Sequence, residues 1–129
     1  MKHPHILALE KFYGDWAKGD LKSALSVCAD SMTFQVSGKS ALAGKYNRDT
    51  LQSFSMKQQD LSQGTFVLEV HDILASDIHA TVLATESVVK DGKKVELRTV
   101  HVWRFESGKP LAGYEYPRDL YQFDAIWGA

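Results

Sequence analysis

Histidine and carboxylate side chains in the second half of the chain are the residues whose types and spacing could do chemistry. His101 lies in a segment of alternating residues from Val95 to Phe105, and Glu115 lies in the next such segment, Leu111 to Tyr116. A histidine held beside a carboxylate can take up and release a proton near neutral pH, as acid–base catalysis requires. We therefore take His101 and Glu115 as the candidate catalytic residues, with Glu115 orienting the imidazole.

Two predicted turns set the register of the strands that carry this pair. Asp91-Gly92 is typical of a two-residue type I′ hairpin turn, and Ser107-Gly108-Lys109 predicts a three-residue turn. Counting back from the second turn sets Glu115 opposite His101, with Cβ atoms roughly 4.5–5.5 Å apart. A bulge at Gly113 would instead turn Glu115 away from that face.

The face that carries His101 carries further side chains, because residues two apart on a strand share a face of the sheet. Aromatic residues of the first half could supply walls for a ring-shaped ligand. The candidate ligand-binding residues are Tyr13, Trp16, Tyr46, Glu86, Thr99 and Trp103. Two alternatives stay open: the aromatic residues are ordinary core, and the His–Glu pair is a buried polar pair that only satisfies itself.

The first half of the chain carries the elements that must position these residues. Apolar residues recur at helical spacing from Ile6 to Trp16, and Gly19 ends that segment. Asp20 is placed to cap a second, short helix. The apolar side of that helix consists of Leu21, Ala24, Leu25 and Cys28.

A short strand and a third helix complete this half. The strand is predicted from Met32 to Val36, and a loop follows it to Gly44. Asn47 or Asp49 is expected to cap the third helix. Its apolar stripe consists of Leu51, Phe54 and Leu61.

The period changes from helical to strand-like at Thr65. Four strands joined by short turns are predicted at Thr65 to Leu74, Ala80 to Lys90, Val95 to Phe105 and Leu111 to Tyr116. Helices followed by an antiparallel meander indicate an α+β domain with the helices packed on one face of the sheet. Residues 119–127 are predicted to form a turn or a helix.

Composition narrows the classes of protein that fit. The chain has 129 residues, 44% hydrophobic and 24% charged, which predicts one folded domain over residues 1–129. A net charge of −1 without a basic block argues against nucleic acid, and no apolar stretch approaches a membrane span. The only cysteine, Cys28, is typical of a reducing compartment, so we expect a cytoplasmic protein. No cofactor motif is present, and His3 and His5 lack a third residue at the spacing of a metal site.

The order of elements resembles the nuclear transport factor 2-like superfamily, within it the ketosteroid isomerase and SnoaL-like polyketide cyclase group. The resemblance is carried by four short segments: Ala17-Lys18-Gly19-Asp20, Val36-Ser37-Gly38, Trp103-Arg104-Phe105 and Gly108-Lys109. It implies a cone-shaped barrel, in which a curved antiparallel sheet of a four-strand meander plus a short strand wraps around three N-terminal helices. It also implies an apolar pocket at the open end of the cone and a homodimer formed through the outer face of the sheet.

The best-known activities of this superfamily are not expected here. The ketosteroid isomerase base would fall within Phe34-Gln35-Val36-Ser37, which has no carboxylate, and its oxyanion aspartate aligns with His101. Its helix-one tyrosine aligns best with Phe12, one residue before Tyr13. The Arg-x-Asp motif of limonene epoxide hydrolase would fall at Thr99-Val100-His101.

Two functions follow as hypotheses. The first is a cofactor-independent isomerase, cyclase or dehydratase that moves a proton on a hydrophobic ring compound. The alternative is a non-catalytic dimeric module that binds a ligand or another protein. The side chains that point outward from the sheet form a mixed apolar and cationic face, which suits a dimer interface. It consists of Leu83, Arg98, Val100, Val102 and Arg104.

Overall fold

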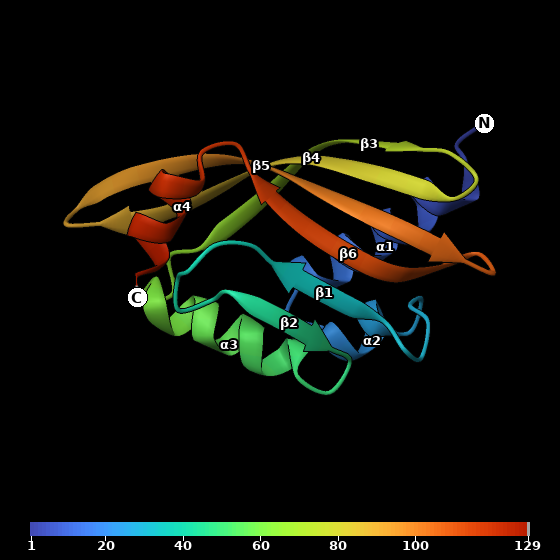
Figure 1. Ribbon diagram of the computed structural model, residues 1–129, viewed down its shortest axis with the longest axis horizontal. Helices are drawn as coiled ribbons and strands as arrows, with labels where there is room; N and C mark the ends of the chain where they lie inside the picture. The colour runs from blue at the N-terminus through green and yellow to red at the C-terminus, as the bar shows by residue number, and fades with distance from the viewer. Residues whose placement is uncertain (129) are drawn as a thin grey trace.

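The computed structural model describes residues 1–128, which form four helices and one six-stranded sheet (Figure 1). In chain order the elements are α1 (Pro4–Ala17), α2 (Leu21–Leu25), β1 (Thr33–Val36), β2 (Gly44–Asn47), α3 (Leu51–Leu61), β3 (Val67–Ala75), β4 (His79–Lys90), β5 (Lys93–Glu106), β6 (Lys109–Pro117) and α4 (Leu120–Trp127). The mixed α+β architecture and the cone-shaped curvature of the sheet are as predicted. None of the described helices is long and apolar enough to cross a membrane.

The helices begin and end where local chemistry directs. Pro4 opens α1, where its missing N–H costs nothing, and Gly19 with φ of 79° follows the end of that helix. The Asp20 side chain caps α2 by accepting from the backbone N–H of Ser23. The prediction for α3 is wrong at its cap: Thr50 is the N-cap residue, and Asn47 instead stabilises the preceding turn by accepting from the Thr50 backbone N–H.

The sheet departs from the predicted barrel in three ways. Its strand order is β2-β1-β6-β5-β4-β3, so it is open, with β2 and β3 at the edges. The strand β2 lies where no strand was predicted, because four residues with a single inward side chain, Tyr46, give almost no alternating pattern. The short strand β1 runs parallel to β6, although the resemblance implies an antiparallel sheet.

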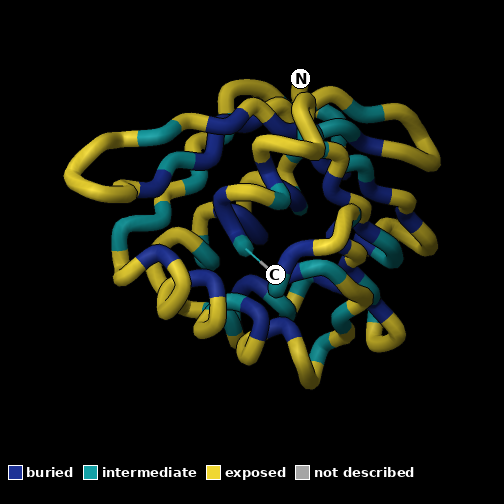
Figure 2. The backbone as a smooth tube through the Cα atoms, turned by 60° about the vertical axis from the view of Figure 1, so that its left-hand side comes forward, coloured by how far each residue is buried: buried dark blue, intermediate teal, exposed yellow. Residues whose placement is uncertain are grey.

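The long strands and the helices enclose the core between them. In Figure 1 the strands β4, β5 and β6 form one layer, and α1, α2 and α3 lie beneath it. Figure 2 shows the buried segments facing this interior and the exposed segments on the outside. Large side chains from distant parts of the chain meet there, among them Phe12 of α1, Phe34 of β1 and Trp103 of β5, each at most 1% exposed. This shared core fixes α1 against the inner face of the sheet.

The C-terminal segment forms the helix α4, one of the two predicted outcomes. Asp119 caps it by accepting from the Gln122 backbone N–H. Asp124 accepts from the backbone N–H of Lys39, and the Ala41 N–H donates to the Gly128 carbonyl. The helix therefore holds the loop between β1 and β2. Gly38, with φ of 96°, lies directly against the Asp124 carboxylate, so that a larger residue would be strained and would displace this carboxylate.

The two hairpin turns set the register that the functional residues need. Asp91 and Gly92 both have positive φ, which confirms the predicted type I′ turn. The second turn has only two residues, Ser107 and Gly108, where three were predicted, and Glu106 pairs with Lys109. A bulge at Leu111 then shifts the register by one residue. The shift has the same effect as the longer turn, so Glu115 lies opposite His101 as predicted.

Candidate functional site

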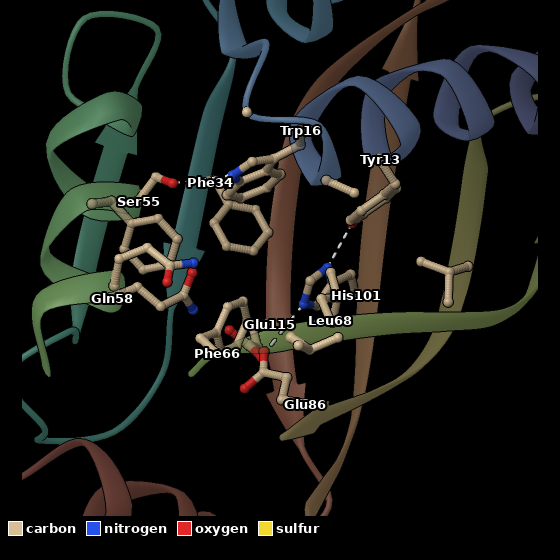
Figure 3. A pocket seen from close by; sticks show the side chains of 16 residues that line it. Tyr13, Trp16, Phe34, Ser55, Gln58, Phe66, Leu68, Glu86, His101 and Glu115 are labelled. Atoms are coloured by element: carbon tan, nitrogen blue, oxygen red, sulfur yellow. Dashed lines mark hydrogen bonds and ion pairs between the residues drawn. The ribbon is translucent and has the colours of Figure 1, made fainter. Parts of the chain in front are cut away.

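A cavity of about 320 Å³ lies between the sheet, α1 and α3 (Figure 3). Aromatic and aliphatic side chains form its walls, and a small polar group lies on the inner face of the sheet. The residues used below are Tyr13, Trp16, Phe34, Phe54, Ser55, Gln58, Phe66, Glu86, His101 and Glu115. The volume falls within the range of small-molecule sites.

Three ionisable side chains form the floor of the cavity. Glu86, His101 and Glu115 come from β4, β5 and β6, three adjacent strands, and each is at most 3% exposed. One polar atom of each lies within 4.8 Å of the others. Charged groups are rarely buried so close together unless they share protons or meet a ligand.

Tyr13 fixes the orientation of His101. The Tyr13 hydroxyl lies 2.6 Å from His101 Nδ1, and the indole N–H of Trp103 donates to the Tyr13 oxygen at 2.9 Å. Burial raises the pKa of Tyr13 well above its ordinary value, although the Trp103 hydrogen bond acts in the opposite direction. The hydroxyl therefore keeps its proton. When that proton is directed at Nδ1, the N–H of the imidazole lies on Nε2, which faces Glu115.

Glu115 is the charged member of the floor. Its Oε2 accepts a hydrogen bond from Thr99 Oγ1 at 3.0 Å and lies 3.4 Å from His101 Nε2. Burial alone would raise the pKa of Glu115, but its neighbours Glu86 and His101 and the hydrogen bond from Thr99 together lower it. Glu115 is thus held as a carboxylate beside the imidazole.

Glu86 behaves in the opposite way. Burial, followed by the charge of Glu115 and the hydrogen bond with it, raises the pKa of Glu86 well above the ordinary value. The Trp127 indole N–H favours the charged form, but it makes no hydrogen bond within normal limits. Glu86 Oε1 has no partner either. The two carboxyl groups therefore share one proton, which Glu86 holds.

The same three side chains are the residues that could hold a metal ion. A carboxylate pair with one imidazole is a reasonable donor set for a divalent cation. A cation would need the Nε2 lone pair of His101, and the proton on Nδ1 would then be directed at the Tyr13 oxygen. Without a cation, the proton shared by Glu86 and Glu115 offsets the charge of the second carboxylate. The floor can therefore hold either a cation or a shared proton.

The predicted ligand-binding residues divide into two groups. Tyr13, Trp16 and Glu86 line the cavity together with His101 and Glu115. The other three lie outside the lining and form part of the support. The Thr99 hydroxyl donates a hydrogen bond to Glu115, and Trp103 is fully buried against Tyr13. Tyr46 donates to the Leu42 carbonyl and stacks obliquely on Phe54 at 4.7 Å.

Several lining residues were not predicted. Phe34, Phe54, Ser55, Gln58 and Phe66 come from β1, α3 and the segment before β3. Phe54 was expected only as part of an apolar stripe. Gln58 follows one turn later on the same side of α3, and that spacing is the signal that could have shown it. Ser55 accepts from the Trp16 indole N–H at 3.3 Å, which links α3 to α1 beside the cavity.

A family model for the SnoaL-like domain matches residues 9–110, which include the floor residues Glu86 and His101. The chain belongs to the SnoaL-like domain family. The fold is accordingly that of the nuclear transport factor 2-like superfamily, as the resemblance implied. No curated protein sequence matches the chain.

Solved structures agree with this SnoaL-like fold. The chain is similar to Bal32a from a soil-derived mobile gene cassette, at 21% identity over 97% of each chain and a TM-score of 0.88. It is similar to a cystatin-like protein of unknown function from Xanthomonas campestris, at 21% identity over 97% of this chain and 98% of that one, with a TM-score of 0.84. TerC, co-crystallized with polyporic acid, matches at 20% identity over 98% of this chain and all of its own, with a TM-score of 0.84.

Proposed function

We propose that this SnoaL-like protein binds a hydrophobic ring compound in its cavity and moves a proton on it through His101 and Glu115. The observation that supports this proposal most directly is the buried pair. Nε2 of His101 lies 3.4 Å from Oε2 of Glu115 at the floor of a cavity with aromatic walls. The neighbour TerC was crystallized with polyporic acid, which supports a ring compound as the kind of ligand. Isomerase, cyclase and dehydratase reactions can each begin with such a transfer.

The step balances with side chains alone. A C–H bond of the ligand, made acidic by a neighbouring carbonyl, breaks, and its proton passes to the Glu115–His101 pair while an enolate forms. The Nε2–H of His101 and the proton held by Glu86 are the available donors for the enolate oxygen. Return of a proton to another carbon completes an isomerisation with no change in oxidation state. Tyr13 acts as a positioning residue, because its hydroxyl is taken up by the imidazole and the Trp103 indole N–H.

The test needs no knowledge of the natural substrate, because proton abstraction is visible as isotope exchange. A ring ketone with an acidic C–H, 2-tetralone, is incubated with the protein in deuterated water, and loss of the C1 proton signal is followed by NMR. Removing a general acid–base group typically slows the step by ~100-fold or more. His101→Gln and Glu115→Gln are each expected to slow the exchange by ~100-fold or more.

His71→Gln is the matched control. His71 also faces a glutamate, with Nδ1 3.5 Å from Glu69 Oε1, but it lies on the edge strand β3 and outside the cavity lining. This variant is expected to exchange at the wild-type rate. Full exchange in His101→Gln would refute the catalytic assignment. Binding of the ketone without exchange in the wild type would favour the alternative function, a non-catalytic ligand-binding module.

A further inference from the structure

Gln58 is a buried polar side chain that has no role in the proposed proton transfer. It lies on α3 with 5% of its surface exposed, and its amide makes no hydrogen bond to another side chain or backbone group within residues 1–128. Its side chain lines the cavity, and Figure 3 shows it extending from α3 toward the floor residues. Buried amides in folded proteins almost always have a partner. The amide of Gln58 therefore faces the cavity, where water or a polar group of a ligand can be its partner.

The floor of the cavity also holds polar atoms without a partner. Glu86 Oε1 and His101 Nε2 are buried without a hydrogen bond, and Glu115 beside them is held as a carboxylate. A hydroxyl can donate to a carboxyl oxygen and accept from the imidazole N–H. Other walls of the cavity are apolar, with Phe34, Phe54 and Phe66 among them. The cavity thus has apolar walls and two polar places, the Gln58 amide on α3 and the floor on the sheet.

The charge of the lining restricts the ligand further. No lysine or arginine lines the cavity in the part of the chain that the structure describes. An anionic ligand would have no fixed cation to meet and would face the Glu115 carboxylate, which is costly in a buried site. An uncharged ligand avoids this repulsion. A neutral amide such as Gln58 can pair with a hydroxyl or a carbonyl without adding charge.

We propose that Gln58 forms a second polar subsite, and that the ligand is an uncharged ring compound with polar groups at both ends. One group, a hydroxyl or an enolisable carbonyl, meets the Glu86, His101 and Glu115 floor, and the other meets the Gln58 amide. This proposal rests on the proposed function only for the identity of the ligand as a ring compound. It does not require that the protein moves a proton on that ligand. Gln58 then determines specificity and is not a catalytic residue.

The experiment compares probes with one and two polar ends. Affinities are measured by calorimetry for two diols, hydroquinone and 2,6-dihydroxynaphthalene, and for their monohydroxy parents, phenol and 2-naphthol. A further probe, 6-hydroxy-2-naphthoate, replaces one hydroxyl with a carboxylate. At least one diol is expected to bind the wild type about tenfold more tightly than its parent, the gain that one additional hydrogen bond to a buried group gives. The carboxylate probe is expected to bind more weakly than the corresponding diol.

Gln58→Met and Gln52→Met separate the subsite from general effects on α3. Methionine has nearly the length of glutamine and suits a helix, but it has no amide. Gln52 lies on the same helix, is exposed and does not line the cavity. The diol preference is expected to disappear in Gln58→Met and to persist in Gln52→Met. A preference that survives in Gln58→Met, or that the wild type does not show, overturns the subsite.

The remaining outcomes distinguish this proposal from the proposed function. If no probe binds the wild type, both the subsite and the ring-compound ligand are overturned. If the diol preference depends on Gln58 but 2-tetralone shows no exchange, the subsite stands and only proton transfer fails. A thermal unfolding curve of each variant shows that the fold is intact, because replacing an unpaired buried amide with an apolar side chain is not expected to lower stability.

Discussion

Glu86 and Glu115 carry the same functional group in the same buried floor, yet their pKa values move in opposite directions. Both are fully inside the protein, so burial alone would raise both. Glu115 pairs with His101 across neighbouring strands and accepts a hydrogen bond from the Thr99 hydroxyl. Glu86 has a carboxyl oxygen without a hydrogen-bond partner. The partners, and not the depth, decide which carboxyl group keeps the proton.

This difference gives a pH dependence with a defined sign. Glu86 has a raised pKa in the folded protein, so above its ordinary value of 4.5 the unfolded chain has released a proton that the folded protein retains. Folding stability therefore falls as pH rises from about 4.5 to the folded pKa of Glu86, by up to ~1.4 kcal/mol per pH unit. Glu115 acts in the opposite direction, because its lowered pKa gives stability that is lost as pH falls below about 4.5.

Glu86→Gln is expected to remove the loss on the alkaline side. Urea unfolding at a series of pH values should show wild-type stability declining relative to that of the variant as pH rises above about 4.5. Glu96→Gln, which changes an exposed carboxyl group on β5, serves as the control and should follow the wild-type curve. Parallel curves for the wild type and Glu86→Gln would show that Glu86 is not protonated in the folded protein.

At the scale of elements, the site depends on how closely the strands and α1 approach one another. Gly113 lies on β6 where Trp103 and Phe34 cross it, and a Cβ at this position would lie 2.7 Å from the Trp103 ring and 2.8 Å from the Phe34 ring. These rings support Tyr13 and His101: Trp103 donates to Tyr13, and the Phe34 ring centroid lies 5.2 Å from that of His101. A glycine on β6 therefore allows the inner face of the sheet to pack.

Two glycine-to-alanine changes are expected to have opposite signs. Gly113→Ala forces the two rings to move and should lower stability by about 1–3 kcal/mol. Gly14 lies inside α1, where an added Cβ would meet no other atom within 4 Å, so Gly14→Ala should raise stability by about 0.5–1 kcal/mol. Urea unfolding of both variants measures the two differences. A loss of stability in Gly14→Ala, or none in Gly113→Ala, would contradict this account of the packing.

The same elements show how far sequence reasoning reaches. The meander and the His101–Glu115 pairing could be predicted, because strand alternation is regular and both turns carry Gly at the position that needs positive φ. The pairing was predicted from a three-residue turn, whereas the structure reaches it through a two-residue turn and a bulge at Leu111. Such a bulge cannot be seen in an alternating pattern. Helical spacing places Gln58 on the side of α3 that carries Phe54, but only the approach of α3 to the sheet shows that this side faces the cavity. Phe66 lies in the segment before β3, where no pattern indicated a cavity residue.

At the scale of the whole molecule, the outer face of the sheet is the surface that the chain itself leaves uncovered. The outward side chains include Leu83, Tyr114 and Tyr116, which are 37%, 38% and 52% exposed. They lie beside the half-buried Val100 and Val102, since Val100 pairs with Leu83 and Tyr116, and Val102 pairs with Tyr114. Arg98 and Arg104 flank this apolar strip. Exposed apolar surface of this continuity is typical of a protein interface.

We expect two copies of the chain to associate through this outer strip in solution. Light scattering coupled to size-exclusion chromatography should give twice the chain mass of 14.4 kDa. Val100→Glu places a charge in the middle of the strip, where a two-fold interface would bring it close to its own copy, so the variant should elute as a monomer. Met56→Glu, on the exposed side of α3 and 60% exposed, is the control and should remain a dimer. The cavity opens on the other side of the sheet, so the monomeric variant should bind ring compounds as the wild type does. A wild-type protein that elutes as a monomer would exclude this interface.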